Sequence, residues 1–365
     1  MKNIINEINF KNEILIADGA TGTNYFDDGL QAGDPPELWN IEKSQSVIEL
    51  HRKFIQAGAN IILTNTFGAN ELRLKFHGID SKLNEININA VKLAKAAVTD
   101  LNKSNVMIGG SIGPTGEIFQ ANGGTFSYSK AIDVFYNQSI ALKKGGVDFL
   151  WIETLSSLEE VDAALTASDK SGMKAVITMS FDTAKKTMMG VSPYEFVKFI
   201  NNRRNKPLAI GANCGIGPSE LLISMKEIKD HLSNEILLVA KGNCGIPEYK
   251  NGKVTYNGNP KVMSKYALLC KLIGIDIIGG CCGTTPEHIL SIKNSLRDNA
   301  RSRSKLNSMR SILQNEHDFS KLISCEIGLP WGQIASEELK SPRKKTRRRK
   351  KSCLRKLKIK TFYRH

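Results

Sequence analysis

Hydrophobic residues along this chain gather in short runs separated by longer amphipathic segments. Each run is rich in β-branched residues and bounded by Gly, Asn or Asp, which is typical of strands buried on both faces of a parallel sheet. The eight runs are Ile14–Gly19, Asn60–Thr66, Val106–Ile112, Phe149–Thr154, Ala175–Phe181, Leu208–Cys214, Ile236–Asn243 and Ile275–Cys282.

The segments between the runs carry apolar residues at helical spacing. The predicted helices are Ser46–Ala57, Leu83–Val98, Lys130–Lys144, Leu158–Ser168, Tyr194–Asn201, Glu220–Leu232, Lys261–Ile273 and Pro286–Leu296. Eight strand–helix units predict an α/β fold, a (βα)₈ TIM barrel. A doubly wound open sheet rarely has eight equal units, and no G-x-G-x-x-G follows the first run.

The pattern divides the chain into three parts. Residues 1–300 are predicted to form the barrel. Residues 301–339 form an extension with room for one amphipathic helix in Ser302–Ser324. Residues 340–365 form a basic tail that we expect to be disordered.

Charge is concentrated in that tail. The 365 residues carry 51 Lys and Arg against 36 Asp and Glu, a net charge of +15. Residues 340–365 hold 14 of the basic residues and no acidic one, so the rest of the chain is nearly neutral. A globally basic nucleic-acid-binding domain is therefore excluded, and specific nucleic-acid binding is not expected. The tail alone fits a solvated terminus, electrostatic docking to an acidic partner or nonspecific RNA binding.

Location is indicated by the apolar runs and the cysteines. None of the runs approaches the roughly 18 residues that a membrane span needs, and residues 1–7 lack a signal-peptide pattern. Seven cysteines, an odd number, argue against a disulfide framework. We therefore expect a cytoplasmic protein without a membrane partner, whose important thiols are metal ligands or nucleophiles.

Four of the seven cysteines fall where predicted strands end. In a (βα)₈ barrel this is the catalytic face. Cys214, Cys244, Cys281 and Cys282 lie there. Three converging thiolates would suit Zn²⁺ with one open tetrahedral position. Cys281 and Cys282 reach one metal only if the chain leaves the pleat, which the neighbouring glycines permit. Without a C-x-x-C knuckle, the spacing equally fits buried, unreactive thiols beside a glycine-rich turn.

Three strings resemble the homocysteine S-methyltransferase family. These are Gly279-Gly280-Cys281-Cys282-Gly283-Thr284-Thr285-Pro286-Glu287-His288, together with Gly211-Ala212-Asn213-Cys214 and Asp18-Gly19-Ala20-Thr21-Gly22-Thr23. The likeness spans roughly residues 12–297. It is closest to the homocysteine-binding N-terminal module of cobalamin-dependent methionine synthase, with betaine–homocysteine methyltransferase as a related branch. The family fold is a (βα)₈ barrel, in agreement with the strand count.

The resemblance implies a zinc enzyme that makes methionine from homocysteine. Cys214, Cys281 and Cys282 would be its catalytic zinc ligands, with Asn243 as a possible fourth ligand before substrate binds. Zinc lowers the pKa of the homocysteine thiol, so the nucleophilic thiolate forms at neutral pH. Cys244 replaces a small residue of that branch and is expected to be a bystander.

Substrate contacts carry over from the same motifs. Asp18 and Glu153 would hold the α-ammonium group of homocysteine. Backbone N–H groups of Gly19, Ala20 and Thr21 would hold its carboxylate. From the residues alone, Asp18 could instead serve as a turn or cap residue.

The methyl donor is less well indicated. No corrinoid-binding D-x-H-x-x-G is present. Two aromatic positions of the betaine branch read Gly68 and Thr154 here, although Tyr25, Trp39 or Phe119 could rebuild a cation–π cage. We expect a separate methyl-corrinoid protein as donor partner, with betaine or S-methylmethionine as alternatives. A non-catalytic zinc- or thiol-binding barrel is the alternative of another class.

Overall fold

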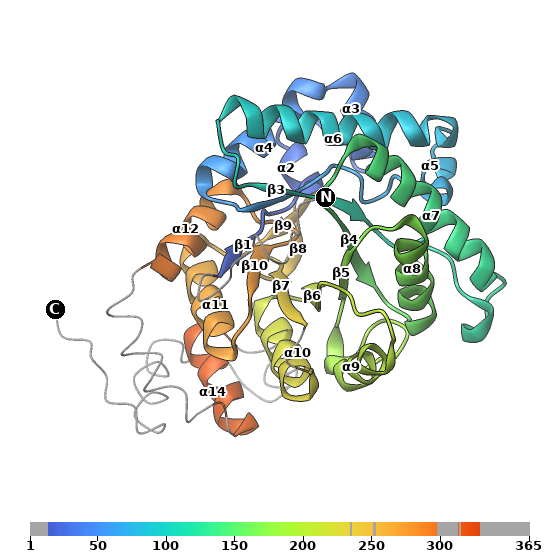
Figure 1. Ribbon diagram of the computed structural model, residues 1–365. Coiled ribbons are helices and arrows are strands. Elements are labelled where there is room, and N and C mark those ends of the chain that lie inside the picture. The colour runs from blue at the N-terminus through green and yellow to red at the C-terminus, as the bar shows by residue number, and fades with distance from the viewer. Residues whose placement is uncertain (1–13, 234–235, 251–252, 298–312, 314, 329–365) are drawn as a thin grey trace.

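Eight parallel strands form a closed barrel surrounded by helices, as a computed structural model shows (Figure 1). The structure describes residues 14–233, 236–250, 253–297, 313 and 315–328. The barrel strands are β1 (Leu15–Ile16), β2 (Ile61–Leu63), β3 (Met107–Ile112), β4 (Phe149–Leu155), β5 (Ala175–Met179), β6 (Ala209–Cys214), β7 (Leu237–Gly242) and β10 (Ile277–Gly280). A bridge between Ala17 and Ile61 joins β1 to β2 and closes the sheet. The predicted (βα)₈ barrel is confirmed.

Every predicted helix is present, and each follows its strand along the chain. The eight are α4 (Ser44–Ala57), α6 (Leu83–Asp100), α7 (Tyr128–Gly145), α8 (Leu158–Ser171), α9 (Pro193–Asn202), α10 (Pro218–His231), α11 (Pro260–Ile273) and α12 (Pro286–Arg297). Their ends follow local chemistry. Ser192 and Glu195 form a capping box at the start of α9, and α8 begins at the cap Ser157 and ends at left-handed Gly172.

Several elements were not predicted from the sequence. Short helices lie in the loops: α2 (Gly22–Tyr25), α3 (Trp39–Glu42) and α5 (Glu71–Phe76), with 3₁₀ turns at Pro36–Leu38, Asp80–Lys82, Gln120–Asn122 and Thr183–Lys185. An antiparallel hairpin of β8 (Pro247–Lys250) and β9 (Lys253–Tyr256) follows β7. The first and last barrel strands are also shorter than predicted, because the backbone leaves the sheet to build the loops at its carboxyl end.

Side chains alternate between the two faces of each strand, so the barrel has two apolar layers. Phe149 and Trp151 belong to the interior cluster, whereas Leu150 and Ile152 pack under the surrounding helices. The same alternation carries Glu153 into the interior above Trp151. The interior is therefore apolar at mid-height and polar toward the carboxyl ends of the strands.

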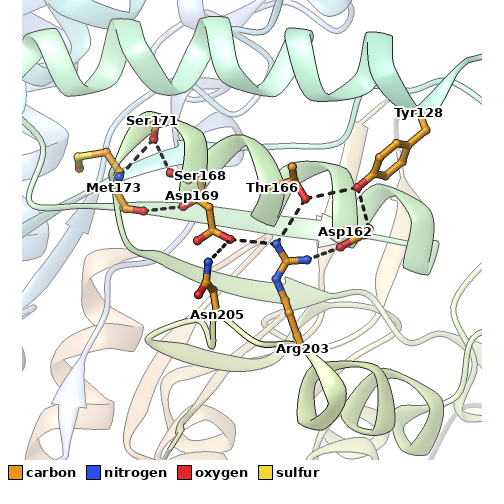
Figure 2. A network of polar contacts seen from close by, with 9 residues as sticks. All are labelled: Tyr128, Asp162, Thr166, Ser168, Asp169, Ser171, Met173, Arg203 and Asn205. Carbon is orange, nitrogen blue, oxygen red and sulfur yellow. Dashed lines mark hydrogen bonds and ion pairs between the residues drawn. The ribbon is translucent and has the colours of Figure 1, made fainter.

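An outer polar network ties three neighbouring helical segments together (Figure 2). Arg203, which follows α9, forms ion pairs with Asp162 and Asp169 of α8. The Tyr128 hydroxyl of α7 donates to Asp162 over 2.7 Å and lies 3.3 Å from Thr166 Oγ1. These contacts lie on the helical shell, so we assign them to stability.

Part of the C-terminal extension packs on the barrel. Helix α14 (Glu316–Glu326) buries Phe319, Leu322 and Ile323 in the main hydrophobic cluster. Ser219 Oγ, at the start of α10, donates to the Gly328 carbonyl. Helix α14 overlaps the end of Ser302–Ser324, the segment with room for one predicted helix, whereas residues 298–312, residue 314 and the basic tail lie outside the described residues.

Two further findings concern helix length and the cysteines. Within the described residues, no helix is long and apolar enough to cross a membrane. Cys325, in α14, is disulfide-bonded, whereas Cys214, Cys244, Cys270, Cys281 and Cys282 are free thiols. The expectation of free thiols therefore holds at the barrel rim but not at Cys325.

Candidate active site

Three cysteine thiols converge at the carboxyl end of the barrel. Cys214 is the last residue of β6, and Cys281 and Cys282 directly follow β10. Their sulfur atoms all lie within 4.8 Å of one another, with Cys214 Sγ and Cys282 Sγ 4.0 Å apart. Cys244, also at this rim, is buried and does not belong to the group. The structure thus brings together the three cysteines selected from the sequence and leaves the fourth aside.

A tight turn allows adjacent cysteines to face the same point. Cys281 N–H still donates to the Gly242 carbonyl of β7 over 2.8 Å, but Thr284 N–H then donates back to the Cys281 carbonyl. Gly283 adopts a left-handed φ of +76°, and a Cβ there would lie 2.3 Å from Tyr256 Cγ. Only glycine fits, so the close approach of Tyr256 and the turn depend on the same residue.

Electrostatics within the trio suit a cation. Hydrogen bonds with Cys214 and Cys281 lower the pKa of the Cys282 thiol well below its usual value. Hydrogen bonds with Cys281 and Cys282 raise the pKa of Cys214. Contacts within the trio therefore favour a negative charge on Cys282. A soft divalent cation would allow all three to ionise, and sulfur-rich sets of this kind favour zinc.

Asn243 provides a neutral oxygen near this rim. Its Nδ2 donates to the Gly215 carbonyl over 2.6 Å, directly after Cys214. Its Oδ1 is buried and has no hydrogen-bond partner among the described residues. An orphaned buried acceptor is costly, so this oxygen is suited to receive a hydrogen bond or a cation.

A buried ion pair lies deeper in the barrel. Lys241 Nζ contacts Asp18 Oδ1 at 2.7 Å, and both side chains are almost completely buried. Asp18 Oδ2 accepts the Leu63 N–H, also at 2.7 Å. Lys241 Nζ lies 5.4 Å from the centre of the Trp151 ring. Each oxygen of Asp18 thus already has a partner inside the protein.

Glu153 is the carboxylate that remains available. Its Oε1 accepts from Ser111 Oγ over 2.7 Å. Burial raises its pKa to about 7, although the nearby Lys241 ammonium opposes this shift. A carboxyl group poised in this way ionises readily when a cation arrives.

The loop after β1 lies against the cysteine turn. Ala20 N–H donates to the Thr284 carbonyl, and a Cβ on Gly19 would lie 2.5 Å from that same oxygen. Of the three predicted donors, Ala20 is therefore engaged internally. In the described part of the chain, the N–H groups of Gly19 and Thr21 have no hydrogen-bond acceptor.

The family model of homocysteine S-methyltransferases matches residues 15–296, which include every site residue named in this subsection. The chain belongs to this family. Its fold is similar to that of the homocysteine methyltransferase MmuM from Escherichia coli. The oxidised form of that enzyme is 21% identical, covering 80% of this chain and 99% of that chain with a TM-score of 0.66. The metallated form is 22% identical, covering 80% and 98% with a TM-score of 0.64.

Two site residues of this family member were missed from the sequence. Lys241 could have been recognised from the sequence, because a lysine inside an apolar strand needs a buried counter-charge. Tyr256 comes from the unpredicted hairpin, and its hydroxyl hydrogen-bonds the Cys282 thiol. An Asn-Gly pair between two short β-rich segments, Asn251-Gly252, was the available signal for that hairpin.

The aromatic residues considered for a donor cage are occupied elsewhere. Tyr25 and Trp39 stack on each other with centroids 4.7 Å apart, and both are buried. Phe119 is buried edge-on against Phe126. Gly68 N–H donates to the Glu37 carboxylate, which fills the space beside that glycine. A cage made from these three rings would require the loops to repack.

Proposed function

We propose that this chain is a zinc-dependent homocysteine S-methyltransferase that forms methionine. The observation that carries the proposal is the convergence of Cys214, Cys281 and Cys282 within 4.8 Å, at the end of the barrel where Glu153 is also held. A metal centre beside an acidic group suits a substrate with a thiol at one end and an ammonium group at the other.

The three thiolates would hold the zinc, with Asn243 Oδ1 as a neutral donor before substrate arrives. Bound there, zinc supplies Lewis acidity, which lowers the pKa of the homocysteine thiol so that its thiolate is the nucleophile at neutral pH. The Tyr256 hydroxyl donates to Cys282 and steadies the negative charge of that ligand. The five free thiols suit a reducing compartment, for which we propose the cytoplasm, although the disulfide at Cys325 does not support that location.

Glu153 would bind the α-ammonium group of homocysteine. Lys241 neutralises Asp18. Glu153 then carries the one remaining negative charge, which the α-ammonium group of the substrate would balance. Asp18 then has a structural role: it binds Lys241 and the Leu63 N–H and so fixes the residues beneath the proposed substrate site. The Gly19 and Thr21 N–H groups would receive the substrate carboxylate.

We further propose a methyl-corrinoid protein as donor partner. The support is the burial of Tyr25, Trp39 and Phe119, the three aromatic residues considered for a cation–π cage around a quaternary ammonium donor. Betaine and S-methylmethionine remain the alternatives to test.

The test combines metal content with methionine formation. The purified wild-type chain should bind about one zinc and convert homocysteine to methionine. Cys214→Ala should lose the metal and all turnover, because two thiolates no longer enclose the cation. Cys244→Ala, a rim thiol outside the trio, is the matched control and should retain both.

Betaine, S-methylmethionine and free methylcobalamin are offered separately as donors. Slow reaction with methylcobalamin alone supports a protein-borne methyl group, whereas rapid turnover with either of the others refutes it. Zinc and homocysteine binding without methionine from any donor would favour the non-catalytic barrel. Full zinc content in Cys214→Ala would refute the ligand assignment.

A further inference from the structure

Strand β4 contains a bulge at the position of Glu153. Ile152 pairs with Ile177 and Leu155 pairs with Met179, so Glu153 and Thr154 together face Thr178. Thr154 has a left-handed φ of 67°, which is unfavourable for a β-branched residue. Bulges of this kind redirect a neighbouring side chain, here the carboxylate proposed to bind the substrate ammonium.

The Asn213 side chain holds this bulge in place from β6, two strands away. Its Oδ1 accepts the Thr154 N–H at 2.9 Å, and its Nδ2 donates to Thr154 Oγ1 at 2.8 Å. Thr178 Oγ1, on the intervening strand β5, donates to the same Oδ1 at 2.7 Å. Asn213 is 1% exposed, so these hydrogen bonds form away from water.

The remaining hydrogen of the amide points to the group of three thiols. Asn213 Nδ2 lies 3.7 Å from Cys281 Sγ, within reach of an N–H···S hydrogen bond. With that contact, both acceptor positions and both donor hydrogens of the amide are used. The next residue, Cys214, is itself left-handed with a φ of 60°. The Asn213 side chain therefore joins the bulge beside Glu153 to the Cys281 thiol, and its backbone continues directly into Cys214.

We propose that Asn213 is a positioning residue that sets the distance between the Glu153 carboxylate and the three-thiol centre, and thereby selects homocysteine over cysteine. This inference rests on the proposed function. An amino acid that places its ammonium group at Glu153 and its sulfur at the thiol centre must span a fixed gap. Cysteine is one methylene shorter than homocysteine and cannot satisfy both ends while the gap is held.

Asn213→Asp is the most informative variant. It keeps the size of the side chain but removes both donor hydrogens and places an acceptor against Cys281. Asn60→Ala is the matched control, since Asn60 is also a strand-end asparagine that accepts a neighbouring N–H, from Ile16, but at the opposite end of the barrel. Thr178→Val removes a single bond to Asn213 and serves if Asn213→Asp does not fold.

The measurement uses protein loaded with Co²⁺ in place of zinc, because the visible spectrum of cobalt reports sulfur binding without turnover. Homocysteine and cysteine are titrated separately, and KM and kcat are then measured on the zinc form. We expect the preference for homocysteine over cysteine to fall on the order of tenfold in Asn213→Asp, with KM changing more than kcat. Thr178→Val should show a smaller change in the same direction, and Asn60→Ala should keep the wild-type ratio.

Three outcomes overturn the inference. One is a folded Asn213→Asp protein with the wild-type ratio, and another is an unchanged ratio in Thr178→Val when Asn213→Asp does not fold. The third is an equal loss of the homocysteine preference in Asn60→Ala, which would show that general destabilisation causes the loss. Wild-type protein that binds Co²⁺ but not homocysteine would instead refute the proposed function, and this inference with it.

Discussion

The two ends of the barrel use the same kind of hydrogen bond for different purposes. At the amino end, an acceptor side chain directly before a strand receives the N–H of the neighbouring strand. Asn60, Asp148 and Asp276 do this for Ile16, Ile108 and Leu238 over 3.1, 2.7 and 2.8 Å. At the carboxyl end, Asp18 accepts the Leu63 N–H in the same way over 2.7 Å. There, however, its second oxygen holds the buried Lys241 ammonium.

This difference separates stabilising groups from positioning groups. Each amino-end side chain satisfies one backbone donor, and its removal should affect stability alone. The carboxyl-end side chains link charges, thiols and left-handed residues, so one change there should alter stability, metal binding and substrate binding together. The following variants test that contrast.

The largest effect is expected at Lys241. Lys241→Met leaves the Asp18 carboxylate buried without its counter-charge, which should lower the free energy of unfolding by about 3–5 kcal/mol. Chemical denaturation measures this loss. The double variant Asp18→Asn with Lys241→Met should recover much of it, because the Asp18 charge is then removed together with its partner. A loss below about 1 kcal/mol in the single variant would contradict the buried pair.

A smaller effect, confined to substrate binding, is expected at Glu153. Glu153→Gln removes the charge proposed to hold the ammonium group, which should raise KM for homocysteine on the order of 10–100-fold with zinc content unchanged. Equal KM values for the variant and wild type would refute this role.

The same carboxylate predicts the pH dependence of homocysteine binding. Its pKa of about 7 means that the wild-type carboxylate becomes protonated as pH falls below that value, so KM should rise there and the variant should lose this trend. The stability of the fold should depend on pH in the opposite direction. Between its ordinary pKa of 4.5 and about 7, the folded chain keeps a proton that the unfolded chain releases, so the contribution of Glu153 to stability falls as pH rises.

The smallest effect is expected at the amino end. Asp276→Ala should lower the free energy of unfolding by about 1–2 kcal/mol, because the Leu238 N–H loses its acceptor. Zinc content and KM should not change, and Asp276→Asn should restore stability. A change in KM would show that the two ends are not separable in this way.

Much of this molecule could be predicted from local pattern. The β-branched runs identified all eight barrel strands. Strand-end positions placed four cysteines at the rim, and the family resemblance selected Cys214, Cys281 and Cys282 from them. Contacts between distant residues could not be predicted, because no periodicity records them. Lys241 meets Asp18 across 223 residues, and the bulge at Thr154 depends on Asn213, 59 residues away. The strands were also predicted too long, because departures from the sheet at Asp18 and Cys281 depend on neighbours that the pattern does not reveal.

The pairing of β1 with β10 also determines when the barrel can close during synthesis of the chain. Leu15 leaves the ribosome early, but its partner Ile277 is made some 260 residues later, close to Cys281 and Cys282. Until then β1 lacks this neighbour, Asn24 lacks its contact with Thr284, and the thiol trio lacks two of its members. Such distant closure is slow relative to local helix formation. Barrel closure and assembly of the thiol trio therefore belong to the same late stage of synthesis, and a nascent chain interrupted before residue 277 has neither.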